Sequence, residues 1–175
     1  MIVTDVTEHG KSKYKIYVDH EFAFVLYKGE LHKYGIKKEK EISEKVYREL
    51  MDEILPKRAK LRTMNLLTKR PYSESKLREK LREGMYPETC VETAIQYVKS
   101  YGYLDDESYA RDYISYHMTS QSPKVMEQKL KLKGIDSGII AKCLDEIEES
   151  DLTKCQKRQI RNLFQKEYHG AVPEN

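Results

Sequence analysis

Long hydrophobic runs are absent from this sequence, and so is a basic-then-apolar leader at its start. A membrane span or a secretory signal would need one of these features, so we expect a soluble, cytoplasmic protein with no membrane partner. Cysteine is also scarce: Cys90, Cys143 and Cys155 form neither an even set nor a CxxC pair, which favours a reducing compartment. We expect Cys90 and Cys143 to fill helical core positions and Cys155 to be inert.

Glycine and proline are few, with 8 and 5 residues, and charged residues make up 35% of the chain. This composition favours exposed helices over a β-sandwich. An excess of one charge is lacking too, because 32 basic residues face 29 acidic ones and leave a net charge of +3. The total charge therefore identifies no partner, and its distribution along the chain is the informative quantity.

Recognisable catalytic patterns are missing as well. The five histidines are scattered without the spacing of metal ligands, and there is no Gly-rich phosphate loop, nucleophile elbow or HExxH pair. We therefore predict a protein that is not an enzyme and that needs no cofactor or metal ion. His117, near a predicted helix end, is interpreted as a surface or capping residue.

The beginning of the chain has a strand pattern. Three runs rich in β-branched and aromatic residues are separated by plausible turns: 2–6, 13–18 and 22–27. Tyr14, Ile16 and Val18 alternate with more polar residues, as in a strand with one buried face, and Asp19-His20 predicts a turn. We predict a small antiparallel β-meander that packs on a short helix. The expected helix contacts are Leu31, Tyr34 and Ile36.

From Glu41 onward the apolar residues recur at helical spacing. Ser43 and Ser73 are candidate N-caps, and Pro56 predicts a break or kink between two helices. Gly84 is expected to end the helix that Ser73 begins.

The pattern that starts at Ser73 recurs from Ser122. Leu77 then aligns with Met126, and Leu81 with Leu130; the next helices continue the match, Val91 with Ile140, Ile95 with Leu144 and Val98 with Ile147. A final helix is predicted from about 151 to 168. Self-similar helical units bury their faces on their neighbours, so we predict a mainly α fold of tandem three-helix repeats in an elongated array.

The predicted domains are five: N-terminal strands with a short helix at 1–40, a degenerate first helical repeat at 41–70, a second three-helix repeat at 71–119, a third at 120–170 and a tail at 171–175. A tight turn at 101–113 joins two of the helices. Gly102 is expected to take the left-handed conformation that closes one helix, and Asp105 to cap the next.

Basic residues are concentrated in one stretch of the chain, and two smaller clusters follow later in the sequence. The candidate binding residues are Lys57, Arg58, Lys60, Arg62, Lys69, Arg70, Lys76, Arg78 and Arg82, with Lys80 in the same cluster, then Lys124, Lys129, Lys131 and Lys133, and in the last predicted helix Lys154, Lys157, Arg158 and Arg161. Aligned as a stripe, these clusters would attract a polyanion such as nucleic acid. The alternative is a set of solvated helix faces offset by acidic residues.

Two stretches carry a family resemblance: LLTKRPYSESKLREKL at 66–81 and YGYLDDESYARDYI at 101–114. They resemble the RecX family of bacterial recombination regulators, and the match extends from about Lys57 to Ile147. The resemblance implies a curved array of three-helix repeats that binds the RecA recombinase filament on DNA and restrains its ATPase, strand-exchange and coprotease activities. The motif residues are interpreted as structural: Leu77, Leu81, Gly102, Tyr103, Leu104, Asp105, Asp106, Tyr109 and Ala110.

Two functions remain open from the sequence. One is a monomeric regulator that binds the RecA filament and touches single- or double-stranded DNA. The alternative is a single-stranded nucleic-acid-binding helical module that acts without RecA, with Tyr72 and Tyr86 stacking on bases beside the basic cluster.

Overall fold

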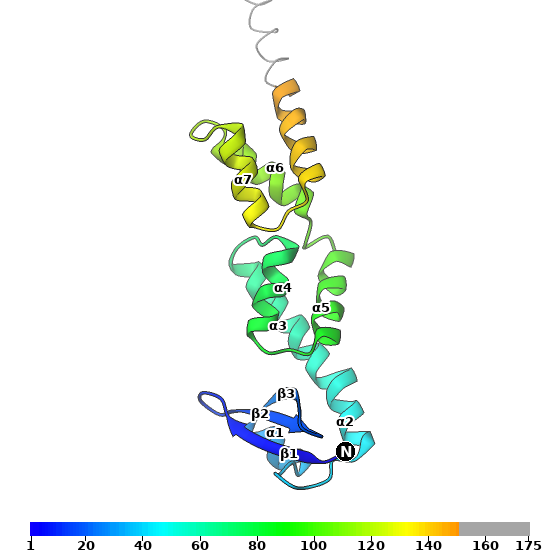
Figure 1. Cartoon of the computed structure of the whole chain (residues 1–175). Helices are drawn as coiled ribbons and strands as arrows, with labels where there is room; N and C mark the ends of the chain where they lie inside the picture. Colours follow the sequence, from blue (N-terminus) through cyan, green and yellow to red (C-terminus); the bar gives the residue numbers. More distant parts are fainter. Residues whose placement is uncertain (151–175) are drawn as a thin grey trace, which may run out of the picture. The chain divides into compact units, whose positions relative to one another are not determined.

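A computed structural model describes residues 1–150 and divides the chain into two compact units, Met1–Asp105 and Asp106–Asn175. Unit 1 holds a three-stranded sheet and most of the helices, and the described part of unit 2 is helical (Figure 1). The predicted fold class, mainly helical with a small N-terminal meander, is confirmed. The predicted last helix, at about 151 to 168, lies outside the described residues, and so do its four cations and Cys155.

The sheet consists of β1 (Val3–Glu8), β2 (Lys13–Val18) and β3 (Glu21–Tyr27), paired antiparallel in the order β1-β2-β3. The turn between β2 and β3 is at Asp19-His20, as predicted. Both residues have positive φ, 48° and 70°, which is the backbone of a type I′ hairpin and suits the twist of the flanking strands. The predicted turn is therefore present, and it sets the register between β2 and β3.

One face of the sheet is buried against helices. Ile16, Phe24 and Leu26 are fully buried, because alternate residues of a strand point to the same side. Helix α1 (Lys28–Tyr34) follows β3 directly and ends at Gly35, whose φ is 64°. The predicted helix contacts are confirmed: Ile36 is buried, and Leu31 and Tyr34 pack half-buried against the same core.

Helices α2 (Glu44–Glu49) and α3 (Leu55–Lys69) form one continuous rod through a π-helical turn, η1 (Leu50–Ile54). Of the predicted break or kink at Pro56, the break is wrong, because the chain stays helical, and the irregularity next to the proline is the π-helical turn. Proline has no N–H, and in an α-helix its ring meets the carbonyl four residues earlier; the wider turn, in which the Leu55 N–H donates to the Leu50 carbonyl, accommodates it. The Met51 carbonyl instead accepts from the Cys90 Sγ at 3.8 Å.

Helices α4 (Glu74–Glu83) and α5 (Glu88–Ser100) pack on α3. Ser73 caps α4 as predicted, since its hydroxyl accepts from the Lys76 N–H. Gly84 follows the last residue of α4, but the left-handed residue is Met85, with φ 60°. Glycine suits position 84 for another reason: a Cβ there would lie in tight contact with the Tyr86 ring, at 3.0 Å.

Unit 2 repeats this packing with α6 (Asp106–His117), α7 (Pro123–Leu132) and a helical segment at residues 137–150. Ser122 caps α7 as Ser73 caps α4. The predicted matches to Leu77, Leu81 and Val91 are buried: Met126, Leu130 and Ile140. Both expected core cysteines, Cys90 and Cys143, are buried free thiols. The domain boundaries predicted within the helical region stay a prediction.

Leu81→Ala should destabilise unit 1 by about 2–5 kcal/mol, because it removes a fully buried side chain from a packed core. Leu61→Ala is the matched control, since the Leu61 side chain is 59% exposed. Urea unfolding followed by circular dichroism measures both. Equal free energies of unfolding for the two variants would contradict the position of Leu81 in the core.

Candidate functional site

The thirteen basic residues expected to bind a partner lie on three helices. Six lie on α3 or at its end, three on α4 and four on α7 or at its end. Their surroundings differ, because some face carboxylates and others face solvent. The ion pairs therefore decide which of them remain available to a polyanion.

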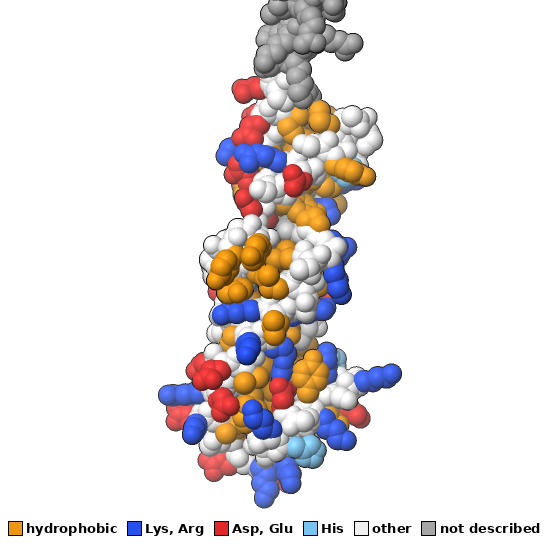
Figure 2. Space-filling model, turned by 180° about the vertical axis from the view of Figure 1, so that it is seen from behind, with side chains coloured by type: hydrophobic (Ala, Val, Ile, Leu, Met, Phe, Trp, Pro, Cys, Tyr) orange, Lys and Arg blue, Asp and Glu red, His pale blue; other side chains and the backbone are white. Residues whose placement is uncertain are grey.

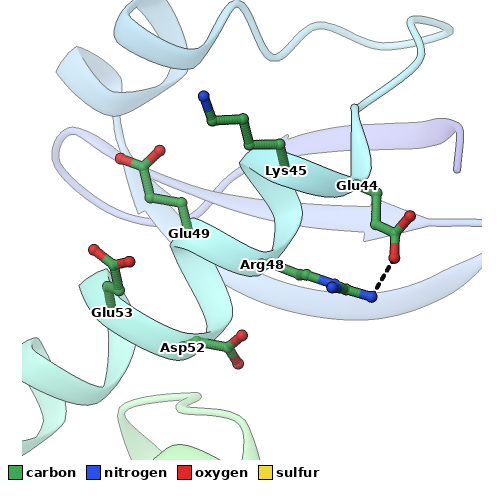
Figure 3. A pocket seen from close by; sticks show the side chains of 6 residues that line it. All are labelled: Glu44, Lys45, Arg48, Glu49, Asp52 and Glu53. Carbon is green, nitrogen blue, oxygen red and sulfur yellow. Dashed lines mark hydrogen bonds and ion pairs between the residues drawn. The ribbon is translucent and has the colours of Figure 1, made fainter.

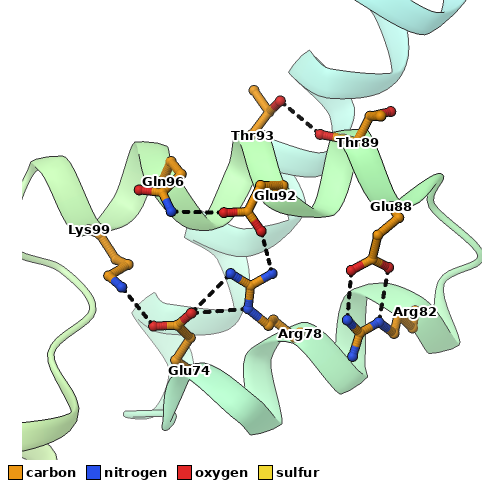
Figure 4. Close-up of polar contacts among 9 residues, drawn as sticks. All are labelled: Glu74, Arg78, Arg82, Glu88, Thr89, Glu92, Thr93, Gln96 and Lys99. Atoms are coloured by element: carbon orange, nitrogen blue, oxygen red, sulfur yellow. Dashed lines mark hydrogen bonds and ion pairs between the residues drawn. The ribbon is translucent and has the colours of Figure 1, made fainter.

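Arg78 is held inside unit 1. Its guanidinium lies between Glu74 on its own helix and Glu92 on α5, with Nε 3.0 Å from a Glu74 oxygen and Nη1 2.7 Å from a Glu92 oxygen (Figure 4). Lys99 completes the network on Glu74 at 2.9 Å. Hydrogen bonding from Arg78 lowers the pKa of the Glu92 carboxyl to about 2. With its side chain only 19% exposed, Arg78 is a link between α4 and α5 rather than a binding residue.

The other two candidates on α4 are paired as well. Arg82 donates from Nε and Nη2 to the two carboxylate oxygens of Glu88, at 3.0 and 2.6 Å (Figure 4). Lys76 donates to Glu79 at 2.7 Å. These neighbouring carboxylates neutralise much of the positive charge that the sequence places on this helix.

Arg58, on α3, joins the helix to the sheet. It forms an ion pair with Glu30, and its Nη1 donates to the Val25 carbonyl at 3.1 Å. Its guanidinium also lies 4.8 Å from the centre of the Tyr27 ring. These contacts and a side chain that is only 20% exposed make Arg58 a structural residue.

The outward side of α3 presents cations without partners. Lys57, Arg62 and Lys69 are exposed and form no ion pair with any other residue in the described part of the chain. Leu61 and Asn65 lie between them, and the four-residue spacing from Lys57 to Lys69 keeps these side chains on one broad face of the helix. We call this set the α3 stripe: Lys57, Leu61, Arg62, Asn65 and Lys69.

Arg70 and Tyr72 extend the basic surface beyond the end of α3. The Arg70 guanidinium lies 4.6 Å from the centre of the Tyr72 ring, within cation–π range. Tyr86, the other tyrosine expected to stack on bases, packs half-buried against the core, and its burial raises the pKa of its hydroxyl. Tyr72 packs half-buried against the same core, and an arginine lies near each tyrosine: Arg70 beside Tyr72, and Arg62 close enough to Tyr86 to act on its hydroxyl.

In unit 2, α7 exposes a comparable mixture of charge and apolar surface. Lys124 and Lys129 are exposed and form no ion pair with another residue among 1–150. Lys131 pairs with Glu127, and the Lys133 ammonium lies 5.9 Å from the centre of the Tyr109 ring. Leu132 is 78% exposed. Each unit thus presents a basic helix face that includes an exposed leucine.

The hollow beside α2 does not resemble an active site. Its volume is about 540 Å³, and it is lined by charged side chains that radiate from α2 and η1 rather than converge (Figure 3): Glu44, Lys45, Arg48, Glu49, Asp52 and Glu53. Among residues 1–150 no group of three or more potential metal ligands occurs. Nor does any helix in this part of the chain have the length and apolar character that a membrane crossing requires.

Comparison with known proteins gives the family. The model described as "RecX, first three-helix domain" matches residues 59–97, and "RecX, second three-helix domain" matches 105–144. Regulatory protein RecX of Caldanaerobacter subterraneus subsp. tengcongensis is 30% identical over 149 residues, which span 84% of this chain and 76% of that protein. The Clostridium perfringens protein of the same name is 31% identical over 150 residues, 84% and 69% of the two chains. This chain belongs to the RecX family.

A crystal structure of a regulatory protein RecX shares the fold, with a TM-score of 0.55, 24% identity and coverage of 99% of this chain and 86% of that one. The RecX-family three-helix domains correspond to groups seen here, because residues 59–97 fall in α3, α4 and α5, and residues 105–144 begin at α6. The chain is therefore a member of a family of regulatory proteins whose helical domains occur in tandem.

The RecX motif residues divide into two groups. Leu77, Leu81, Leu104 and Ala110 are buried, as expected of structural positions. Gly102 has the predicted left-handed backbone, with φ 70°, α6 begins just after Asp105, and Tyr109 packs half-buried in unit 2. Tyr103 differs: it is 55% exposed and does not belong to the core. The two-residue turn around Gly102 places the Tyr103 side chain on the surface. The motif alone did not predict this exposure.

Arg78→Met should lower the free energy of unfolding by about 1–2 kcal/mol, because Glu74 and Glu92 both lose a partly buried hydrogen-bonded cation. Arg62→Met, on the α3 stripe, should change it little. Thermal melting at pH 7 measures both. The difference between wild type and Arg78→Met should shrink as the pH falls from 4.5 towards 2, since Glu92 then becomes protonated in the folded protein. Equal melting of the two variants would contradict the structural role of Arg78.

Proposed function

We propose that this RecX-family protein binds the RecA–DNA filament and chiefly inhibits its ATPase, strand-exchange and coprotease activities. The family membership supports a regulatory role, and the resemblance of residues 66–81 and 101–114 connects that role to RecA. We further propose that it acts by binding rather than catalysis, as a monomer in the cytoplasm, where recombinase filaments form on DNA.

The observation that carries this proposal is the α3 stripe. Most other candidate cations of unit 1 face carboxylates or tyrosine rings, whereas Lys57, Arg62 and Lys69 have no such partner among the described residues. Cations of this kind attract phosphate groups through contacts that weaken strongly with salt. Leu61, exposed between them, adds apolar area that a protein partner can cover.

The α7 face of unit 2 supplies a second contact of the same kind, through Lys124, Lys129 and Leu132. A filament repeats its subunits, so two similar faces on one chain can engage neighbouring positions. Two linked contacts bind more tightly than either alone when their spacing fits the partner. Such binding suits inhibition at low ratios of regulator to recombinase.

We predict that the protein slows RecA-dependent ATP hydrolysis on single-stranded DNA well below one molecule per RecA. The reason is that one bound chain engages more than one filament subunit and restrains its neighbours. Steady-state ATP hydrolysis, measured with the regulator titrated against RecA, tests this. Unchanged hydrolysis at equimolar regulator would contradict the proposed function.

Reversing the charges of the α3 stripe tests its role. The triple variant Lys57→Glu, Arg62→Glu, Lys69→Glu should weaken filament binding with little change in melting temperature, because these side chains are exposed and form no ion pair within residues 1–150. A plot of log affinity against log salt concentration has a negative slope. If three phosphate contacts are lost, this slope should become shallower by about 2–3. Fluorescence anisotropy of labelled filaments measures the affinity.

The matched control reverses three exposed lysines near the sheet: Lys11→Glu, Lys37→Glu and Lys40→Glu. It changes the net charge of the protein equally but leaves α3 intact. Equal losses of affinity in the two variants would show that total charge, rather than the α3 stripe, determines binding.

The second candidate function is single-stranded nucleic-acid binding without RecA. The stacked Arg70–Tyr72 pair beside the α3 stripe favours it, because aromatic rings next to cations are typical of single-strand grooves. A salt titration on naked strands separates the two candidates. Tight binding without recombinase favours the second, and binding that becomes strong only on filaments favours the first.

A further inference from the structure

Three tyrosines form an exposed ladder at the end of α5. Tyr97, Tyr101 and Tyr103 are 36%, 59% and 55% exposed. The first two rings meet edge to face with their centres 5.0 Å apart, and Tyr101 and Tyr103 are nearly parallel, 14° apart, at 5.7 Å. Figure 2 shows hydrophobic side chains gathered as a patch on the helical part of unit 1. Rings that are this exposed do not serve the core.

The sequence builds this ladder outside the core by helix geometry. Helix α5 buries Val91, Ile95 and Val98, so Tyr97 and Tyr101, four residues apart, share a different side of it. Gly102 then turns the chain with φ 70°, and the Tyr103 N–H donates to the Val98 carbonyl at 2.9 Å. That bond fixes the backbone of Tyr103 so that its ring stacks beside Tyr101.

The ladder adjoins the α3 stripe through Lys60. The Lys60 ammonium lies 5.0 Å from the centre of the Tyr97 ring. On α3, Lys60 is three residues from Lys57, so the two lysines are neighbours on the helix surface. Lys60 thus lies between the exposed aromatic rings and Lys57, which forms no ion pair within residues 1–150.

We propose that Tyr97, Tyr101 and Tyr103 stack on unpaired nucleobases of a single strand whose phosphates lie along Lys57 and Lys60. Flat exposed rings bind bases of any sequence, and adjacent cations bind the backbone, which is the combination that single-strand grooves use. The charge decides between a strand and a protein partner, because cations on the neighbouring helix face complement a polyanion. A duplex hides its bases, so the ladder adds nothing to duplex binding. This site goes beyond the proposed regulation of the filament, and it rests on the second candidate function, single-strand binding without RecA, to which it assigns the residues that contact the bases.

The first test removes two rings. Tyr101→Ala with Tyr103→Ala should lower the affinity for a fluorescent oligo-dT about tenfold or more at low salt, since stacking on each base contributes at least a severalfold factor. The affinity for a duplex of the same length should not change. Tyr101→Phe with Tyr103→Phe keeps the rings and should bind oligo-dT like wild type. Tyr116→Ala, which removes an 80% exposed tyrosine of unit 2, is the control.

A second measurement reads the stacking directly. The sequence contains no tryptophan, so Tyr103→Trp introduces a single indole at the ladder. Oligo-dT should quench its emission, whereas duplex should leave the emission unchanged. Quenching of equal size by duplex would overturn base stacking at this position.

Two further outcomes decide against the proposal. An unchanged oligo-dT affinity of the double alanine variant, with normal melting, would overturn it. Loss of RecA inhibition with unchanged oligo-dT affinity would show instead that the ladder is a protein contact. Both outcomes leave the proposed filament regulation intact, because wild-type ATPase inhibition measures that function separately.

Discussion

Helix α3 packs Leu55, Ala59 and Leu66 into the core of unit 1, and this burial determines which of its cations face solvent. Helical geometry then places Lys57 on the opposite side, whereas Arg58 reaches Glu30 and the sheet. A basic residue on this helix is therefore structural or available according to whether a neighbouring element brings a carboxylate or carbonyl within its reach. The α3 stripe is the surface that results, and the proposed contact with a polyanionic filament depends on it.

Acidic residues determine which of the other cations are neutralised. The chain has nearly as many carboxylates as cations, and on α4 they neutralise Arg78 and Arg82 from the start of α5 and from α4 itself. The same arrangement recurs in unit 2, where Arg111 pairs with both Glu107 and Glu146. These pairs fasten the helices of each unit together. They leave the binding surface to residues that have no carboxylate within reach.

Local features of this structure could be predicted from the sequence, and features that depend on distant contacts could not. The hairpin at Asp19-His20 and the cap at Ser73 follow from neighbouring residues, and the family follows from motifs. The π-helical turn at Pro56 could not be predicted, because a break and a widened turn both relieve the same clash. The pairing of Arg78 with Glu92 required knowledge of how α4 lies on α5. The exposure of Tyr103 could not be predicted, because a motif gives the identity of a residue and not the direction of its side chain.

A photoreactive side chain placed on α3 tests the central claim most directly. p-Benzoylphenylalanine at Leu61, inside the α3 stripe, should cross-link to RecA or DNA when the protein is irradiated on filaments. The same group at Ser75, exposed on α4, should give little product. Cross-linking from Ser75 with none from Leu61 would contradict the account, because the filament would then contact a part of unit 1 other than the α3 stripe.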